Sequence, residues 1–430
     1  MELRVRRSEL QGKVAIPGSK SHTIRALVIA SLAEGRSVLR RPLVSADAEA
    51  AVRVCRAFGA EIELGEEWVV NGVAGKPLVP ADVVDVGNSG TTLYVCAATA
   101  ALVDGYTVFT GDEQIRRRPV ELLLGALRDL GAEAFTTRGD GCAPFVVRGP
   151  MRGGKTVLDC PTSQYLTALL LNAPLAQGDT EIEVPRLNER PYVQMTLDWL
   201  DGQRIRYQAE GMEHFVIPGC QSYKGFEGQI PADWSSATFF LCAGALGQGE
   251  VRLTGLELTD SQGDKAVVEM LRKMGARVED QGEDGIVVSG GHLHGAELDL
   301  NATPDALPAL AATACFAEGE TRLVNVAQAR LKETDRIAVM AEELRKMGAE
   351  VEEREDGLVI RGTKLRGAKV HGHGDHRVVR ALAVAGMKAE GETVVDTAEA
   401  MAVTFPDFAE LMRGLGGEVS VGESLSGWTG

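Results

Sequence analysis

The sequence predicts an α/β protein of two lobes, each built from three similar units. A helical pattern recurs six times and ends each time in a glycine that precedes a strand-like run. Glycine is the expected helix stop because it adopts the left-handed backbone conformation without strain. Units of this length hold a small sheet and two helices, and six of them group most simply as two lobes of three. The stops are Gly59, Gly131, Gly202, Gly275, Gly348 and Gly416, which lie 68 to 73 residues apart.

Length and composition are those of a soluble globular protein with two or three domains. The chain has 430 residues, of which 44% are hydrophobic and 25% charged. No apolar run reaches the roughly 18 residues of a membrane span, and residues 1–7 lack the apolar segment of a signal peptide. Seven cysteines without a Cys-x-x-Cys spacing argue against a disulfide framework and against a zinc site. We therefore expect a cytoplasmic location and no membrane partner.

The formal net charge of −16 disfavours nucleic acid as a partner. It does not exclude small anionic substrates, because at physiological salt charges beyond about 8 Å are mostly screened. A local group of lysines and arginines can therefore outweigh a distant acidic surface.

The first such group follows Pro17, where the chain leaves a strand-like run and begins a helix. Ser19 can cap this helix, Lys20 lies at its N-terminus, and Ser21 and Arg25 lie four residues apart on one face. Free backbone N–H groups and the helix dipole make such a start suitable for phosphate or carboxylate. An ordinary capped helix with surface charges explains the pattern equally well.

Similar helix starts recur along the chain. A glycine-rich turn at residues 86–92 joins a strand-like run to an apolar helix and can cradle an anion, although such turns are common. Pro119 ends a run of three arginines and places Arg118 beside the next helix. Hydroxyl and amide groups at residues 162–164 stand at a further helix start, where they can donate to phosphate oxygens.

A dense charged cluster lies at residues 332–336. Thr334 or Asp335 is a suitable N-cap for the apolar-periodic run that follows. Lys332 and Arg336 are four residues apart and would share a helix face. Glu333 would then lie between two cations, a setting in which a carboxylate can act as a proton carrier. The alternative is a solvated, charged helix start.

Two further stretches carry acidic or imidazole groups. Asp305 follows Pro304 on a first helical turn, where an acid is favourable on structural grounds alone. Residues 371–376 match the zinc-binding His-x-His-x-Asp-His spacing of metallo-β-lactamase-like hydrolases. That site needs more ligands later in the chain, and no histidine follows His376, so we expect no metal there. Residues 375–377 instead indicate another helix start.

Taken together, these stretches resemble the 5-enolpyruvylshikimate-3-phosphate synthase family, from about residue 10 to residue 412. Seven motifs occur in the family's order, which makes the resemblance specific. They are Pro17–Leu27, Gly87–Thr91, Ser163–Leu170, Pro304–Asp305, Lys332–Arg336, Asp375–Arg377 and Thr404–Asp407.

The resemblance implies a two-lobed enolpyruvyl-transferase fold. Each lobe would consist of three βαβαββ units around packed helices, an inside-out α/β barrel. The C-terminal lobe would comprise residues 1–18 and 231–430, and the N-terminal lobe residues 19–230. The active site would lie in the cleft between the lobes, and lobe closure would complete it.

The resemblance also implies a reaction. The enolpyruvyl group of phosphoenolpyruvate would pass to the 5-hydroxyl of shikimate 3-phosphate, with release of phosphate, by addition and elimination through a tetrahedral intermediate. Asp305 resembles the base for the hydroxyl and Glu333 the acid for the methylene carbon, with Lys20 assisting. The family's members are commonly monomers and need no metal or organic cofactor.

The resemblance assigns a set of ligands to each substrate. The acceptor set, for shikimate 3-phosphate, is Lys20, Ser21, Arg25, Thr162, Ser163, Gln164, Gln328 and Lys332. The donor set, for phosphoenolpyruvate, is Lys20, Gly90, Arg118, Gln164, Arg336, His376 and Arg377.

Four positions depart from the family pattern. Tyr94 stands where the family usually has arginine, Glu189 where a serine commonly binds the acceptor phosphate, and Val403 where many members carry a lysine for phosphoenolpyruvate. Gln328 replaces a common asparagine, which is a mild change. Losing a cation and gaining Glu189 bear on affinity and on the identity of the acceptor.

Two alternatives follow. The chain could transfer enolpyruvyl to another alcohol, as does the UDP-N-acetylglucosamine enzyme, whose family has a Lys-Asn pair and a loop Cys or Asp. Here the pair is Lys20-Ser21, and residues 116–118 contain no cysteine. The chain could also be a non-catalytic anion-binding relative, which would need no acid–base pair, yet Asp305 and Glu333 are both present.

Overall fold

The computed structural model describes residues 1–423, and the chain divides into two compact units. Unit 1 contains Met1–Pro17, Ala232–Leu258 and the chain from Gly263 onward. Unit 2 contains Gly18–Pro231 and the short segment Thr259–Gln262, which the sequence did not indicate. Asp260 of that segment contacts His22 of the same unit, with 3.1 Å between Oδ1 and Nε2.

Residues 1–423 form six four-stranded sheets with one shared arrangement. In each sheet the first strand is parallel to the second, and the third and fourth follow antiparallel. In sheet order, the strands of unit 2 are β14 (Glu227–Gln229), β3 (Arg36–Arg40), β5 (Glu67–Asn71), β4 (Glu61–Glu63); β6 (Val84–Asp85), β7 (Tyr106–Thr110), β9 (Phe145–Arg148), β8 (Glu133–Thr136); and β10 (Gly154–Val157), β11 (Thr180–Glu183), β13 (His214–Ile217), β12 (Gln208–Glu210).

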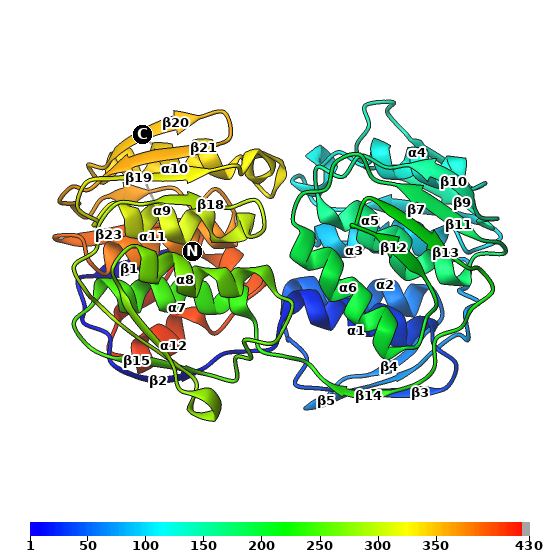
Figure 1. Ribbon diagram of the computed structural model, residues 1–430, viewed down its shortest axis with the longest axis horizontal. Coiled ribbons are helices and arrows are strands. Elements are labelled where there is room, and N and C mark those ends of the chain that lie inside the picture. The colour runs from blue at the N-terminus through cyan, green and yellow to red at the C-terminus, as the bar shows by residue number, and fades with distance from the viewer. Residues whose placement is uncertain (424–430) are drawn as a thin grey trace. The chain divides into compact units, whose positions relative to one another are not determined.

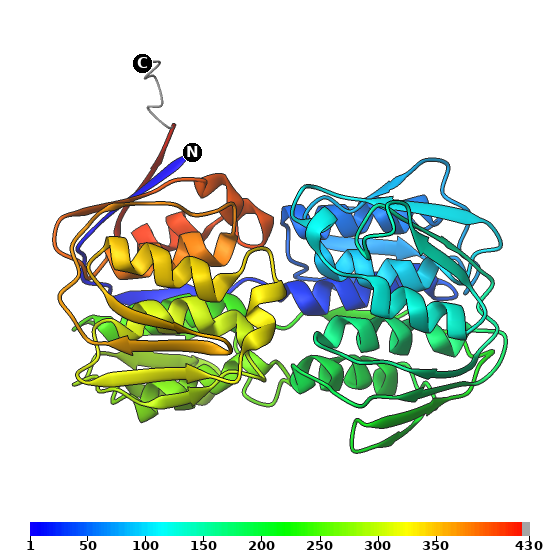
Figure 2. The ribbon, with the colours of Figure 1, turned by 90° about the horizontal axis from the view of Figure 1, so that it is seen from above.

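Unit 1 repeats this arrangement, and chain segments that are distant in sequence complete its sheets. The N-terminal strand lies beside the C-terminal one, with Leu3 opposite Val421 (Figure 2). In sheet order, the strands are β2 (Gly12–Ala15), β15 (Val251–Thr254), β17 (Ile286–Ser289), β16 (Arg277–Asp280); β18 (Glu297–Asp299), β19 (Glu320–Val324), β21 (Gly357–Arg361), β20 (Glu350–Arg354); and β22 (Lys369–Val370), β23 (Glu392–Val395), β1 (Glu2–Arg6), β24 (Glu418–Gly422).

Among the described residues, each unit has three central helices and three outer ones. The central helices bury nearly every residue, and within each unit they lie together (Figure 1). They are α1 (Lys20–Leu32), α3 (Gly90–Ala100) and α5 (Ser163–Asn172) in unit 2, and α7 (Trp234–Leu246), α9 (Leu307–Ala314) and α11 (His376–Gly386) in unit 1.

The outer helices bury one face and expose the other. Most of their charged residues lie on the exposed side, as expected for helices that cover a core. They are α2 (Ala46–Ala57), α4 (Glu121–Asp129) and α6 (Arg190–Gly202) in unit 2, and α8 (Val267–Lys273), α10 (Arg336–Lys346) and α12 (Phe408–Gly414) in unit 1. Short 3-10 turns are η1 (Ile115–Arg117), η2 (Ala173–Leu175), η3 (Gly263–Ala266), η4 (Gly282–Asp284), η5 (Pro304–Ala306), η6 (Ala327–Leu331) and η7 (Ala398–Val403). Within residues 1–423, no helix has both the length and the apolar character needed to cross a bilayer.

The six predicted helix stops are confirmed at five positions and wrong at one. Gly59, Gly131, Gly275, Gly348 and Gly416 follow their helices with φ between 92° and 102°. Gly202 instead lies inside α6, and Arg204 holds the left-handed position with φ 58°. The N–H of Arg204 donates to Asp201 O, as the N–H of Gly275 donates to Arg272 O. The turn after α6 therefore keeps the geometry of the other five, although its left-handed residue lies two positions after the glycine.

The helix stops lead to a stability prediction. Gly348 has φ 94° and open space where a Cβ atom would stand, so Gly348→Ala is strained by its backbone alone. We expect a loss of about 1–2 kcal/mol in the free energy of unfolding. Arg204→Gly should gain about 1 kcal/mol, because it removes the same strain from an exposed position. Urea denaturation measures both.

Gly414 provides the matched control. It also has open space, but it lies inside α12, so Gly414→Ala should stabilise the protein by about 0.5–1 kcal/mol. Equal effects of alanine at positions 348 and 414 would contradict the assignment of the left-handed stop.

Candidate active site

The central helices of unit 2 are exposed only at their N-termini. Helix α1 buries every residue except Lys20 and Ser21, α3 every residue except Thr91, and α5 every residue except Gln164. Each start has a side-chain cap, and the predicted one, Ser19, accepts a hydrogen bond from His22 N. Helix N-termini offer unpaired N–H groups and the positive end of the dipole. Unit 2 therefore presents polar groups suited to anions where its core helices begin.

Arg25 is a buried cation that lies beneath these starts. Its guanidinium donates to the hydroxyls of Thr196 at 2.9 Å and Thr167 at 3.3 Å, and to the carbonyl oxygens of Ser21 and Tyr192. Within the described chain, all of these acceptors are neutral oxygens. Burial lowers the pKa of Arg25 to about 10, against a smaller opposing effect of Tyr192, so the group stays charged at neutral pH. A buried charge held by neutral partners attracts an anion.

Each of three contacts includes at least one other predicted ligand of unit 2. Arg118 lies directly over Gly90, where a Cβ atom would clash with the arginine Nη1, so this close approach requires glycine. The Thr91 hydroxyl donates to Oε1 of Gln164 at 3.0 Å, linking the starts of α3 and α5. Lys20 pairs at 3.0 Å with Asp47, a buried acid on the first turn of α2.

The third start, at α5, already holds a carboxylate. Oε2 of Glu189 accepts hydrogen bonds from the Ser163 hydroxyl at 2.7 Å, the Ser163 N–H at 3.2 Å and the Thr162 hydroxyl at 3.3 Å. Glu189 is 2% exposed. The predicted phosphate donors at this start are thus brought together, and an acid of the same chain occupies them.

In unit 1, the candidate residues converge on Arg336, the first residue of α10. This guanidinium is buried and pairs with Asp305 at 2.8 Å, Glu333 at 2.5 Å and Asp375 at 2.8 Å. Burial alone would lower the pKa of Arg336, but Asp375, Glu333 and Asp305 raise it well above its usual value. The two predicted proton carriers, Asp305 and Glu333, therefore lie on either side of one permanent cation.

Asp305 has a second arginine partner. Nη2 of Arg377 lies 3.0 Å from its Oδ2, while Nη1 of Arg377 donates to the Ser235 hydroxyl at 2.7 Å. Burial raises the pKa of Asp305, but the positive charges of Arg377, Lys332 and Arg336 outweigh it and hold the pKa far below the usual range. Asp305 is therefore ionised, and it is a weak base as long as these cations surround it.

His376 begins α11 beside this cluster. It is buried, and in the described chain neither ring nitrogen has a hydrogen-bond partner. Burial lowers its pKa well below the usual value, against the opposing charge of Glu333, so the imidazole is neutral. An unsatisfied buried imidazole can accept or donate one hydrogen bond to a ligand.

One geometric prediction for this segment is wrong. Asp335 is the N-cap, as expected, and accepts from Ala338 N at 3.0 Å. Because the helix begins only at Arg336, Lys332 lies outside it, after η6, and the two cations do not share a helix face. Lys332 still acts electrostatically on Asp305. Gln328 lies within η6, is buried, and donates to the Asn301 carbonyl at 3.1 Å.

The residues that hold these groups in place were not predicted from the sequence. Asp375 was expected only as part of a helix start, yet it caps α11 and accepts a hydrogen bond from the Arg336 guanidinium. The position of Asp375 directly before a predicted helix was a signal in the sequence that could have identified it as the cap. Asp47 and Thr196 carried no signal, because their partners Lys20 and Arg25 are distant in sequence.

Two of the departures from the family pattern lie in ordinary structural positions. Tyr94 is buried in α3 and donates to the Pro119 carbonyl at 3.2 Å. Val403 ends η7. Neither side chain brings a charge to its position, so the cations expected there in other members have no replacement at these two residues.

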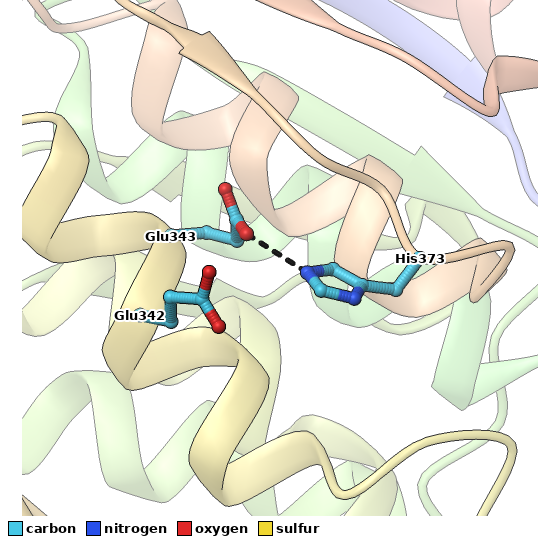
Figure 3. Close-up of side chains that lie close together, drawn as sticks. All are labelled: Glu342, Glu343 and His373. Carbon is cyan, nitrogen blue, oxygen red and sulfur yellow. Dashed lines mark hydrogen bonds and ion pairs between the residues drawn. The ribbon is translucent and has the colours of Figure 1, made fainter.

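The histidine motif at residues 371–376 contributes to a different cluster. In the described chain, Glu342, Glu343 and His373 form a group whose ligand atoms lie within 4.8 Å of one another. Figure 3 shows the His373 ring directed at Glu343, with Glu342 beside it on the same helix. Lys346 lies 2.8 Å from Glu343 and 3.1 Å from Glu342. Its ammonium group supplies the positive charge that these carboxylates require, which favours an ion-pair network.

Comparison with known proteins agrees with this architecture. Residues 5–412 match the family EPSP synthase (3-phosphoshikimate 1-carboxyvinyltransferase). Relatives named 3-phosphoshikimate 1-carboxyvinyltransferase include one from Ruminiclostridium cellulolyticum, 56% identical over 98% of this chain and 100% of the relative. Another, from Methanococcoides burtonii, is 44% identical with the same coverage of both chains. A solved structure of EPSP synthase from Acinetobacter baumannii superposes with a TM-score of 0.82 at 28% identity, covering 98% of this chain and 100% of the other.

These likenesses place the chain among the two-lobed transferases, and the predicted fold class is confirmed. Within that class, the family match extends over nearly the whole chain. The chain belongs to the EPSP synthase family.

The Glu343 cluster leads to a prediction about acid stability. Burial would raise the pKa of Glu343, but hydrogen bonds from Lys346, His371 N–H and His373 lower it. A carboxylate with a depressed folded-state pKa stabilises the protein above its unfolded value of about 4.5 and loses that contribution as pH falls through the folded value. Glu343→Gln should therefore cost about 1–3 kcal/mol at pH 7, and the difference from wild type should shrink under acid conditions.

Urea midpoints at pH 7 and pH 4 measure this effect. Glu342→Gln is the control, because that side chain is 59% exposed and should change stability by less than about 0.5 kcal/mol. A difference for Glu343→Gln that grows as the pH is lowered would contradict the assignment.

Proposed function

We propose that the chain transfers the enolpyruvyl group of phosphoenolpyruvate to the 5-hydroxyl of shikimate 3-phosphate and releases phosphate. The family match and the names of its relatives support this reaction. The observation that carries the chemistry is the Arg336 cluster, in which one buried guanidinium pairs with both Asp305 and Glu333. Transfer by addition and elimination needs a base and an acid close together, and this cluster supplies two carboxylates at fixed positions.

Asp305 serves as the base for the attacking hydroxyl. Its pKa is held low by Arg377, Lys332 and Arg336, two of which belong to the donor set. When the carboxylate and phosphate of phosphoenolpyruvate bind Arg336 and Arg377, the negative charge of the donor offsets the positive charge of the two guanidinium groups. The pKa of Asp305 then rises, so that donor binding itself makes Asp305 a stronger base. This coupling would keep the base inactive until the donor is in place.

Glu333 serves as the acid for the methylene carbon. In the addition step, the acceptor oxygen bonds to C2 of phosphoenolpyruvate, its proton goes to Asp305, and a proton from Glu333 goes to C3. In the elimination step, the Glu333 carboxylate takes a proton back from C3, the C2–C3 double bond re-forms, and the C2–O bond to phosphate breaks. The departing phosphate takes up the proton that Asp305 received in the addition step. Neutral His376, next to Glu333, is placed to hydrogen-bond the donor without adding charge.

The starts of the central helices in unit 2 bind the anionic groups. Buried Arg25 lacks a carboxylate partner in the described chain, and together with Lys20 it suits the acceptor. Arg118 over Gly90, and Gln164 linked to Thr91, suit the donor. That the sets of the two units bind one substrate pair stays a prediction. The remaining assignments are Ser21, Thr162, Ser163, Gln328 and Lys332 for the acceptor.

We further propose that the protein acts as a monomer, without metal or organic cofactor, in the cytoplasm. The seven cysteines are free thiols, as is usual in a reducing compartment.

A phosphate-release assay tests the reaction. Wild-type protein should release phosphate only when phosphoenolpyruvate and shikimate 3-phosphate are both present, and the ether product should appear in equal amount. Release with UDP-N-acetylglucosamine instead would assign a different acceptor. Binding of both substrates without release would leave only an anion-binding role.

Replacement of Glu333 tests the proposed acid. Glu333→Gln keeps the shape and a hydrogen-bonding group but removes the transferable proton. We expect kcat to fall by about 100-fold or more, while the dissociation constants of both substrates change little. Glu342→Gln, an exposed change of the same kind on α10, should retain wild-type kcat. Wild-type turnover by Glu333→Gln would remove Glu333 from the mechanism.

A further inference from the structure

Glu189 stands out among the residues of unit 2 because its side chain binds the start of another helix. It directly precedes α6, but in the described chain its carboxylate makes no capping bond to that helix. The side chain reaches the start of α5 instead, where Oε2 accepts the three hydrogen bonds from Thr162 and Ser163. One carboxylate oxygen therefore accepts hydrogen bonds from both hydroxyls and from a backbone N–H at the start of α5.

The backbone at Glu189 is held in an unfavourable conformation. Its φ of 59° and ψ of 41° lie in the left-handed region, which glutamate rarely adopts. Strained residues persist where the surrounding structure determines them, and they are frequent at functional sites. The three hydrogen bonds of the side chain offset this strain and fix the carboxylate at the start of α5.

The groups that bind Glu189 are those of a phosphate site. Two hydroxyls and an N–H at the start of a ten-residue helix point at one negatively charged oxygen. The same donors form part of the proposed acceptor set, in which Thr162 and Ser163 hold the 3-phosphate. Thr162 and Gln164 are only half-buried, so a ligand can reach this position. The carboxylate thus stands in for the phosphate that the donors would otherwise bind.

We infer that Glu189 is a specificity-determining residue, a resident carboxylate that the phosphate of the acceptor must displace. The inference rests on the proposed function of this site. Two anions cannot share the same three donors, because like charges a few ångströms apart repel strongly in a partly buried site. Before the phosphate binds, the Glu189 carboxylate must turn away from these donors. The affinity for phosphorylated acceptors is therefore lower than the remaining donors would allow, whereas an unphosphorylated ring is unaffected.

Direct binding measurements test this role. Titration calorimetry would give the dissociation constants of shikimate 3-phosphate and of unphosphorylated shikimate for wild type, Glu189→Gln and Glu189→Ser. Glutamine keeps the size of the side chain without the charge, and serine removes most of it. We expect both variants to bind shikimate 3-phosphate about tenfold more tightly or better, with little change for shikimate.

Glu183→Gln is the matched control. Glu183 is an exposed residue of β11 and belongs to neither proposed ligand set, so the variant has the same change in net charge and should bind both probes as wild type does. The comparison of two probes separates competition for the phosphate from a general structural effect, which would alter the binding of both.

Two results would overturn the inference. Unchanged or weaker binding of shikimate 3-phosphate by both variants would show that Glu189 does not compete with it. Wild-type protein that binds shikimate more tightly than shikimate 3-phosphate, with the same order in Glu189→Gln, would show a site built for an unphosphorylated ring. Failure of the proposed function is a separate outcome, because it would appear as absent phosphate release while the tighter binding by the variants remained.

Discussion

The burial of the six central helices is the constraint on which the rest of the structure depends. Helices α7, α9 and α11 are buried at every residue, and α1, α3 and α5 at every residue beyond their first turn. A helix enclosed in this way can present polar groups only at an end. The chain places its hydroxyl, amide and cationic side chains at the N-terminal ends, where the helix dipole also favours anions. The packing that buries these helices therefore also determines where groups suited to an anion can lie.

The two units use their cations differently. In unit 2, buried Arg25 is held by neutral oxygens, which leaves its charge available to a ligand. In unit 1, Arg336 and Arg377 are already paired with Asp305, Glu333 and Asp375. An anion that binds there must compete with the carboxylates, and in doing so it changes their proton affinity. The first arrangement is therefore suited to binding an anion, and the second agrees with the proposed proton transfer by Asp305 and Glu333.

Local signals in the sequence predicted helix starts and stops well. Ser19 and Asp335 are the expected caps, and five of the expected glycines follow their helices. The predictions failed for two reasons: one local pattern allowed two residues to take the same backbone position, and some contacts join residues that are distant in sequence. Arg204 takes the left-handed position expected of Gly202. Contacts such as Asp375 with Arg336 join residues 39 apart in sequence, so they depend on the packing of separate helices, which no local pattern contains.

The pairing of the first strands with late ones has a consequence for biosynthesis. Strand β1 lies between β23 and β24, and β2 completes a sheet with β15. The residues of unit 2, by contrast, are nearly contiguous and end at Gln262. As the chain leaves the ribosome, unit 2 can form all of its sheets before the partner strands of β1 and β2 have been synthesised. Strand β1 can meet its first partner only after residues 392–395 have emerged, and its sheet is complete only after residue 422 has emerged.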